Sequence, residues 1–295
     1  MGPRRRRGMN EMDVRKIETA PDLVFDVSVA GNDSDTLVLM LHGFGVSRHF
    51  WKAQVPVLGK AGYFAVAPNQ RGYSAGARPD PANLDSYRFD KLTGDALDLA
   101  SAVGRGDKRF HLVGHDWGAS LAWAIAFQHP ERLRSLTILS RPHPMSFARA
   151  LAMPDGEQKR RSGHHQAFLE PDAVPKVLAD DCAWLRKRHA KEGVPKEAID
   201  LHLSVLGNAP AMEAALAWYR ARGERMPLGP IQVPTLYLWG DADDTVGRAA
   251  AEGTGEFIAA PYRFEVLPGV GHYAADQVPA RVNELLLEHL GRYAA

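Results

Sequence analysis

The feature that most constrains this chain is a short apolar run that ends in a Gly-x-Asp-x-Gly motif. Phe110–Val113 is followed by Gly114-His115-Asp116-Trp117-Gly118 and then by a segment rich in Ala and Leu. This pattern predicts a buried strand, a sharp turn and a helix, with Asp116 at the apex of the turn. Both flanking glycines have a steric reason, because so tight a turn leaves no room for a Cβ atom beside the apex. An aspartate that merely caps the following helix is the alternative interpretation.

A carboxylate at the apex restricts the chemistry that such a turn can perform. The reference pKa of an aspartate is about 3.9, so Asp116 is expected to be ionised near neutral pH and to attack without a base. Attack on an ester or amide carbonyl would give an anhydride, which reverts more easily than it goes forward. Attack on a saturated carbon gives an ordinary ester, which water activated by a general base can hydrolyse. The expected substrates are therefore epoxides and alkyl halides.

The composition excludes several classes of partner. The chain has 295 residues, 45% of them hydrophobic and 24% charged, and its net charge of +1 gives no global field to attract nucleic acid or an anionic membrane. The single cysteine, Cys182, excludes an internal disulfide and indicates a reducing, cytoplasmic compartment. No apolar run reaches the roughly 18 residues that span a bilayer. Residues 1–20 contain the Arg4–Arg7 run but no signal-peptide core, which favours a disordered, functionally silent tail over a nucleic-acid-binding arm.

Predicted strands alternate with predicted helices along most of the chain. Continuous apolar runs indicate strands covered on both faces of a sheet, and apolar residues at helical spacing indicate the helices between them. The predicted strands cover 23–29, 37–41, 64–68, 110–113, 136–139, 234–239 and 262–267. The predicted helices of this part cover 90–103, 119–129 and 279–290. This alternation indicates an α/β fold with a mostly parallel, doubly wound sheet.

The alternation is broken between residues 142 and 230. Helical patterns replace strands there and cover 173–185, 196–206 and 211–221. An insertion at this place, before the last two strands, predicts a helical cap over the carboxyl ends of the strands, where ligands bind in open α/β folds. The core would then comprise 21–141 and 231–295. A separate helical domain without a catalytic part is the alternative.

Three further motifs follow other predicted strands: His42-Gly43-Phe44-Gly45, Gly240-x-x-Asp243 and Gly271-His272. Together with the Asp116 turn, they make the chain after residue 20 resemble the α/β-hydrolase superfamily, and within it the epoxide hydrolases and haloalkane dehalogenases. The resemblance implies that Asp116 is the nucleophile and His272 the base that activates water. It implies that Asp243 orients His272 and stabilises its protonated form.

The resemblance also implies roles for the surroundings of the nucleophile. The backbone N–H groups of Phe44 and Trp117 would form an oxyanion hole that serves the hydrolysis of the ester. Asp241 and Asp244 compete with Asp243 for the role of the orienting acid, and the family spacing of three residues after Gly240 favours Asp243.

Two positions in the helical insertion bear on the choice between the subfamilies. Ala217-Trp218-Tyr219-Arg220 resembles the Asn-Trp-Tyr-Arg segment that carries one of the two acidic tyrosines of epoxide hydrolases, which points to Tyr219. The other tyrosine of that pair should precede Phe168-Leu169-Glu170-Pro171, and His164 stands there instead. Either a protonated His164 donates in place of a tyrosine, or Tyr219 acts alone. A third reading is that His164 resembles the halide-binding histidine of haloacetate dehalogenases.

The expected substrate pocket also includes His42, His165 and Trp218. The pair His164-His165 does not predict a metal site, because no third ligand stands at a recognisable spacing. We therefore expect an epoxide hydrolase without cofactors that acts on a small apolar epoxide and binds neither nucleic acid nor membrane. A dehalogenase with the same three residues and a non-catalytic binding member of the fold are the alternatives. A homodimer is left open.

Overall fold

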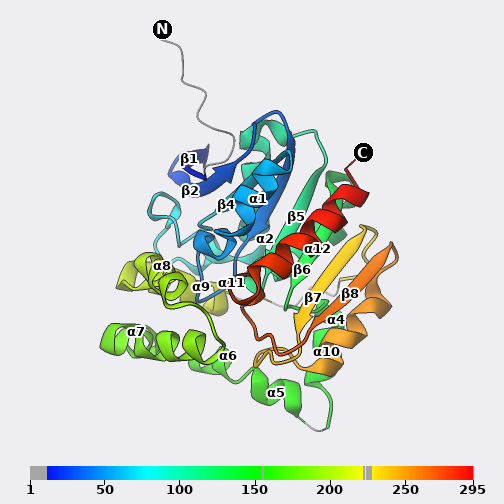
Figure 1. Cartoon of the computed structure of the whole chain (residues 1–295). Helices are drawn as coiled ribbons and strands as arrows, with labels where there is room; N and C mark the ends of the chain where they lie inside the picture. Colours follow the sequence, from blue (N-terminus) through cyan, green and yellow to red (C-terminus); the bar gives the residue numbers. More distant parts are fainter. Residues whose placement is uncertain (1–11, 155, 222, 224–227, 295) are drawn as a thin grey trace.

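One eight-stranded sheet organises the protein in the computed structural model, which describes residues 12–154, 156–221, 223 and 228–294. The strand order is β1-β2-β4-β3-β5-β6-β7-β8 (Figure 1). Strands β3 to β8 run parallel, whereas β1 and β2 are antiparallel to their neighbours. The strands are β1 Asp13–Ala20, β2 Leu23–Ala30, β3 Thr36–Leu41, β4 Tyr63–Pro68, β5 Phe110–His115, β6 Leu133–Leu139, β7 Thr235–Gly240 and β8 Tyr262–Leu267. The predicted mostly parallel sheet is confirmed.

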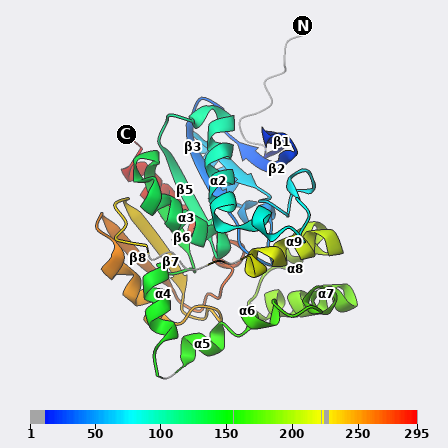
Figure 2. The same cartoon turned by 180° about the vertical axis from the view of Figure 1, so that it is seen from behind.

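Helices cover both faces of this sheet. Helices α1 (Gln54–Lys60) and α12 (Pro279–Arg292) contact each other on one face (Figure 1). Helices α2 (Phe89–Ala100) and α3 (Trp117–Gln128) contact each other on the opposite face (Figure 2). Because the sheet is covered on both sides, every residue of β4, β5 and β7 is buried. Such strands appear in the sequence as continuous apolar runs rather than as alternating ones.

The start of the chain differs from the prediction. The expected disordered tail covered residues 1–20, of which 1–11 lie outside the described residues. Residues 13–20 form β1, which pairs antiparallel with β2, so the prediction is wrong for this segment. The strand lies at the edge of the sheet, where backbone pairing holds it while charged side chains such as Arg15 and Lys16 stay accessible. Because β1 carries charged residues on both of its faces, its sequence lacks the apolar alternation that would predict a strand.

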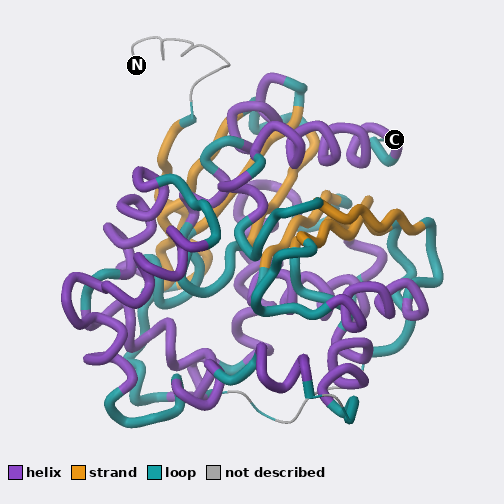
Figure 3. The backbone as a smooth tube through the Cα atoms, turned by 60° about the horizontal axis from the view of Figure 1, so that its bottom comes forward, coloured by secondary structure: helices purple, strands orange, loops and turns teal. Residues whose placement is uncertain are grey.

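The helical insertion between β6 and β7 contains α4 to α9 within the described residues. These helices are α4 Pro144–Leu151, α5 Glu157–Arg161, α6 His164–Ala167, α7 Ala173–Lys191, α8 Lys196–Leu206 and α9 Ala209–Arg220. Helices α5 to α9 gather at one end of the sheet (Figure 1), whereas α4 contacts α10 (Arg248–Glu252). Figure 3 shows helices on several sides of the strands. The bounds of α8 and α9 agree with the predicted helices to within two residues. Helix α7 is longer than predicted and is interrupted at residues 180–182, where φ lies between 50° and 57°.

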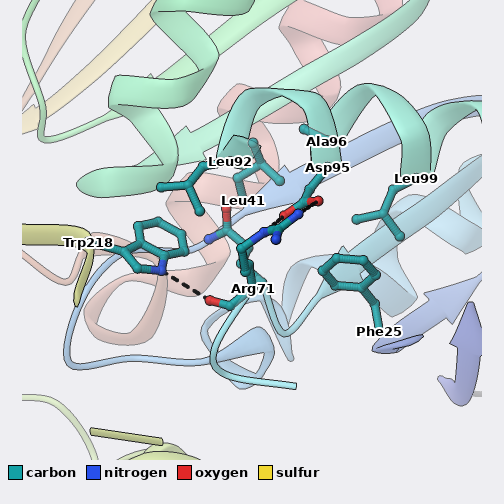
Figure 4. A pocket seen from close by; sticks show the side chains of 9 residues that line it. Phe25, Leu41, Arg71, Leu92, Asp95, Ala96, Leu99 and Trp218 are labelled. Carbon is teal, nitrogen blue, oxygen red and sulfur yellow. Dashed lines mark hydrogen bonds and ion pairs between the residues drawn. The ribbon is translucent and has the colours of Figure 1, made fainter. Parts of the chain in front are cut away.

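A buried ion pair ties the insertion to the core. Arg71 follows β4 and donates from Nε and Nη2 to the two carboxylate oxygens of Asp95 on α2, at 2.7 and 2.6 Å. The indole Nε1 of Trp218 on α9 donates to the backbone oxygen of Arg71 at 3.1 Å (Figure 4). Apolar side chains surround this group, including Phe25 and Leu92. A bidentate pair in such surroundings fixes the position of the loop after β4.

Candidate active site

Asp116 occupies the apex of a strained turn between β5 and α3. Its φ of 50° and ψ of −113° are unusual for a residue with a side chain. A Cβ atom added to Gly114 would lie 2.6 Å from the backbone oxygen of Gly118, and one added to Gly118 would collide with the backbone oxygen of Leu41. The predicted steric need for both glycines is therefore confirmed. The close approach of strand, turn and helix holds the Asp116 carboxylate at the end of the sheet.

The Asp116 carboxylate is surrounded by donors. Its Oδ1 accepts the backbone N–H of Phe44 at 3.0 Å, and its Oδ2 lies 3.9 Å from Nε2 of His272. Burial alone would favour the neutral acid, but His272, His115 and the Phe44 N–H lower the pKa of Asp116 well below its usual range. The carboxylate is therefore ionised at neutral pH, as expected from its residue type.

His272 lies between Asp116 and a second buried carboxylate. Its Nδ1 is 3.2 and 3.3 Å from the two carboxylate oxygens of Asp243. Asp243 is 1% exposed, and its Oδ1 also accepts the backbone N–H groups of Thr245 and Val246 at 2.7 and 3.1 Å. Burial raises the pKa of Asp243, but the charge of His272 and the hydrogen bonds to the carboxylate lower it by more, so the net pKa lies below the usual value. Asp243 is thus held as a carboxylate against His272.

The two aspartates that compete with Asp243 have other partners. Asp241 is exposed and accepts the backbone N–H of Gly269 at 2.7 Å. Asp244 forms an ion pair with Arg188 of the helical insertion at 2.9 Å. Of the three, Asp243 is the one whose carboxylate lies within hydrogen-bond distance of His272 Nδ1.

The charge of Asp116 and the protonation of His272 are linked. Burial lowers the pKa of His272, but Asp243, Asp116 and Glu192 raise it, to about 9. His272 is therefore protonated at neutral pH while Asp116 is charged. Conversion of Asp116 into an uncharged ester removes one of the three negative charges and lowers the pKa of His272. Loss of the Asp116 charge thus favours the neutral imidazole.

A cavity separates the carboxyl ends of the strands from the helical insertion. The core contributes Phe44, Asp116, Thr245, His272 and Tyr273 to its lining. The insertion contributes His164, Phe168, Trp184, Leu185, Arg188 and Tyr219. The structure therefore brings Asp116 and His272 into one cavity with the two candidate donors of the insertion, Tyr219 and His164. The side of the cavity formed by the insertion is largely aromatic and apolar.

Aromatic packing positions Tyr219, and burial sets the charge of His164. The Tyr219 ring packs edge-on against Phe44 and Trp117, with centroids 5.4 and 5.0 Å apart. Burial lowers the pKa of His164 to about 4. The lowered pKa favours a neutral His164 at physiological pH, and of the two alternatives it favours the one in which Tyr219 alone supplies the proton. A neutral imidazole still offers one N–H donor.

Three residues expected in the substrate pocket are not part of the cavity lining within the described residues. His42 is fully buried beneath the turn, where Nδ1 donates to Gly43 O at 2.9 Å and Nε2 accepts the Gln70 N–H at 3.2 Å. Trp218 points to the Arg71 loop, as described above. His165 packs against two lining side chains, His164 and Tyr219, with ring centroids 4.4 and 5.7 Å apart. The prediction is therefore wrong for His42 and Trp218, whereas a pocket role of His165 stays a prediction.

The helical insertion holds the loops that carry Asp243 and His272 through hydrogen bonds. The Glu192 carboxylate at the end of α7 accepts the backbone N–H of His272, and the side-chain amide of Gln277 donates to the Glu192 backbone oxygen. Arg188 donates to Asp244 Oδ1 and Thr245 Oγ1 at 2.9 and 2.8 Å. These residues could not be predicted from the sequence, because a helical pattern does not reveal which residue at the end of a helix meets a distant loop.

The described residues contain neither a cluster of metal-binding side chains nor a membrane-spanning helix. Within them, no group of three or more His, Cys, Asp or Glu side chains is arranged to hold a metal ion. No helix in the same part of the chain is both long and apolar enough to cross a bilayer.

Comparison with known proteins places this geometry in a family. Residues 36–278 match the family described as alpha/beta hydrolase fold. The AB hydrolase superfamily protein YfhM of Bacillus subtilis is 31% identical over 91% of this chain and 94% of its own length. Epoxide hydrolase A of Mycobacterium tuberculosis is 27% identical over 88% of this chain and 92% of its own length. A solved structure from a study of novel epoxide hydrolases in metagenomes from hot environments has a TM-score of 0.83 at 26% identity, covering 95% of this chain and 99% of that one. The chain therefore belongs to the alpha/beta hydrolase fold family.

Proposed function

We propose that this protein is an epoxide hydrolase that converts an epoxide into a vicinal diol. The observation that carries the proposal is the ionised Asp116 carboxylate, which shares one cavity with His272, Tyr219 and His164. Relatives named as epoxide hydrolases cover most of the chain and support the same reaction class. The apolar and aromatic lining favours an uncharged, apolar epoxide as substrate.

In the first step, Asp116 attacks a ring carbon of the epoxide. The new C–O ester bond forms as the ring C–O bond breaks, and the electron pair of that bond goes to the departing oxygen. Tyr219 gives its phenolic proton to this oxygen, while the neutral His164 donates a hydrogen bond. The imidazolium of His272 becomes more acidic once Asp116 is esterified, and the proton that it releases restores Tyr219.

In the second step, the neutral His272 takes a proton from a water molecule. The resulting hydroxide adds to the ester carbonyl of Asp116, and the backbone N–H groups of Phe44 and Trp117 stabilise the oxyanion. When the intermediate collapses, the diol leaves with the proton held by His272, and Asp116 keeps the oxygen atom and the second proton of the water. That proton then passes from the Asp116 carboxyl to His272, which restores the carboxylate and the imidazolium. Asp243 keeps the imidazole oriented and stabilises its charged form throughout.

The helical insertion acts in this scheme as a cap. Residues 142–230 would cover the site of a core formed by 21–141 and 231–295. The insertion supplies Tyr219 and His164 as donors, together with much of the apolar lining. Exclusion of bulk water by such a cap protects the ester and strengthens the hydrogen bonds within the site.

Replacement of the proposed acid tests the proposal most directly. We expect Tyr219→Phe to lower the rate of ester formation with styrene oxide by about 10²- to 10⁴-fold, because the leaving oxygen loses its proton donor. Rapid-quench mass spectrometry of the adduct measures this step. Tyr262→Phe is a matched control, because the Tyr262 hydroxyl is buried and has no hydrogen-bond partner among the described residues. Full activity of Tyr219→Phe, or no diol from a broad panel of epoxides, would contradict the proposal.

The two half-reactions should respond differently to pH. Because the pKa of Asp116 is lowered well below its usual range, the carboxylate stays ionised in mildly acidic and neutral solution, and ester formation does not require a change in its charge. Ester hydrolysis requires neutral His272, and its rate should therefore rise with pH, by roughly tenfold per pH unit below the pKa of His272 in the ester form. Single-turnover measurements of adduct decay check this sign. Hydrolysis that slows as the pH rises would exclude His272 as the base.

A dehalogenase is the second candidate, and one observation favours it. The neutral His164 offers an N–H donor but no readily lost proton, which suits a halide better than an alkoxide. Release of chloride, bromide or fluoride from haloalkanes or haloacetates, without diol from epoxides, would decide for this function. A binding member of the fold would form no covalent adduct with either class of compound.

A further inference from the structure

Ser140 follows β6 in a conformation that few residues with side chains adopt. Its φ is 65°, and it is 4% exposed. The backbone N–H of Ser140 donates to Leu238 O at 2.9 Å, and its carbonyl accepts the Tyr237 hydroxyl at 2.7 Å. Both partners belong to β7, so the neighbouring strand fixes the main chain of Ser140 from two sides. The side chain therefore leaves the sheet in a defined direction.

The Ser140 hydroxyl lies between the acid and the base. Its Oγ donates to Asp243 Oδ2 at 2.6 Å and lies 2.9 Å from Nδ1 of His272. This second distance is shorter than the direct separations of 3.2 and 3.3 Å between His272 Nδ1 and Asp243. A hydroxyl has one proton to donate and two lone pairs to accept with. Because the Ser140 proton is used on Asp243, a lone pair of Oγ faces the Nδ1–H of His272.

We infer that Ser140 is a positioning residue that bridges Asp243 and His272. Its hydroxyl accepts the Nδ1–H of the imidazole and donates its own proton to the Asp243 carboxylate. The Nδ1 proton of His272 is then shared between two acceptors, Ser140 Oγ and the Asp243 carboxylate. This arrangement fixes Nδ1 as the protonated nitrogen and keeps Nε2 directed at Asp116, from which it is 3.9 Å away. The catalytic consequence rests on the function proposed above, whereas the hydrogen bond itself does not.

The alternative is that Ser140 only completes the turn after β6, and three variants separate the two roles. Both Ser140→Gly and Ser140→Ala remove the hydroxyl. Glycine adopts a positive φ without strain, whereas alanine at this position keeps the unfavourable backbone conformation. Ser146→Ala is the matched control, because it deletes another buried serine hydroxyl, which donates to Ala250 O at 2.7 Å. A structural role predicts that Ala and Gly differ; a bridging role predicts that they agree.

The first measurement needs no substrate. In the full-length protein, proton NMR should show a downfield resonance of the His272 Nδ1–H, assigned by its absence from His272→Gln. We expect this resonance to be lost through exchange with water, or moved upfield, in both Ser140 variants and to be unchanged in Ser146→Ala. An unchanged resonance in Ser140→Gly would overturn the inference, whether or not the protein hydrolyses epoxides.

The second measurement follows the two half-reactions with styrene oxide. Loss of a hydrogen-bond partner of a functional imidazole should slow adduct hydrolysis by about 10- to 100-fold in both Ser140 variants. Adduct formation should change by less than about threefold, since Asp116 and Tyr219 are untouched. Adduct hydrolysis within about twofold of wild type in Ser140→Gly would overturn the catalytic part of the inference. Failure of the wild type to form any adduct would instead count against the proposed function.

Discussion

His272→Gln should stop turnover while leaving the first half-reaction intact. Glutamine has no basic nitrogen, so water is no longer activated, and loss of a general base costs about 10²- to 10⁴-fold in the hydrolysis step. The nucleophile Asp116 is retained and faces the same cavity, so the ester should form and accumulate. Intact-protein mass spectrometry after incubation with styrene oxide should show an increase by the mass of one substrate molecule. Digestion should place that mass on the peptide containing Asp116.

The control for this variant is another buried histidine. His289 on α12 forms a hydrogen bond with Leu136 O at 3.1 Å, and neither residue belongs to the cavity lining. His289→Gln should therefore turn over epoxide without accumulating adduct. If His272→Gln hydrolyses epoxide at the wild-type rate, another group activates water. If it forms no adduct although wild type makes diol, the reaction does not pass through an ester at Asp116.

Asp116→Asn should remove both half-reactions. The amide is nearly isosteric and can keep the place of the carboxylate, but it is uncharged and does not displace an epoxide oxygen. Loss of the nucleophile should therefore reduce turnover by about 10⁴-fold or more, with no adduct detectable by mass. In the wild type, turnover in heavy-oxygen water should label the Asp116 carboxylate, because one of its oxygens is replaced in every cycle.

Asp241→Asn provides the matched carboxylate control. Asp241 stands near the orienting acid in sequence but caps the backbone N–H of Gly269 at the surface. We expect this variant to keep turnover within about threefold of wild type. The Asp116→Asn protein should be checked by sequencing of the peptide, which excludes reversion to aspartate. If this protein still converts epoxide, the proposed mechanism is wrong. Absence of label from Asp116 during wild-type turnover would do the same.

Most of the fold could be predicted from local signals. Buried parallel strands leave continuous apolar runs, and the turn at Asp116 leaves two glycines whose Cβ atoms the structure cannot accommodate. The chain order of motifs then located the residues that meet at the carboxyl ends of the strands. The edge strand β1 was not predicted, because it pairs with β2 through its backbone and this pairing requires no apolar side chains.

Two residues of the predicted pocket, Trp218 and His42, lie away from the cavity for different physical reasons. Trp218 precedes Tyr219 on α9, and consecutive residues of a helix point about 100° apart, so proximity in sequence to a cavity residue is poor evidence for lining the cavity. His42 turns away to bond Gln70, a partner on another loop. Ser140 was missed because its two partners stand 103 and 132 residues later. Its place at the carboxyl end of a strand next to β5 was the signal that could have identified it.

The contact between Glu192 and His272 links the helical insertion to the position of the imidazole. The Glu192 carboxylate at the end of α7 accepts the main-chain N–H of His272 itself, and Arg188 on the same helix holds Asp244, the residue beside Asp243. A displacement of α7 would have to break these bonds or move both loops with it. Under the proposed function, a substitution at this end of α7 would therefore change the alignment of the base without touching the substrate.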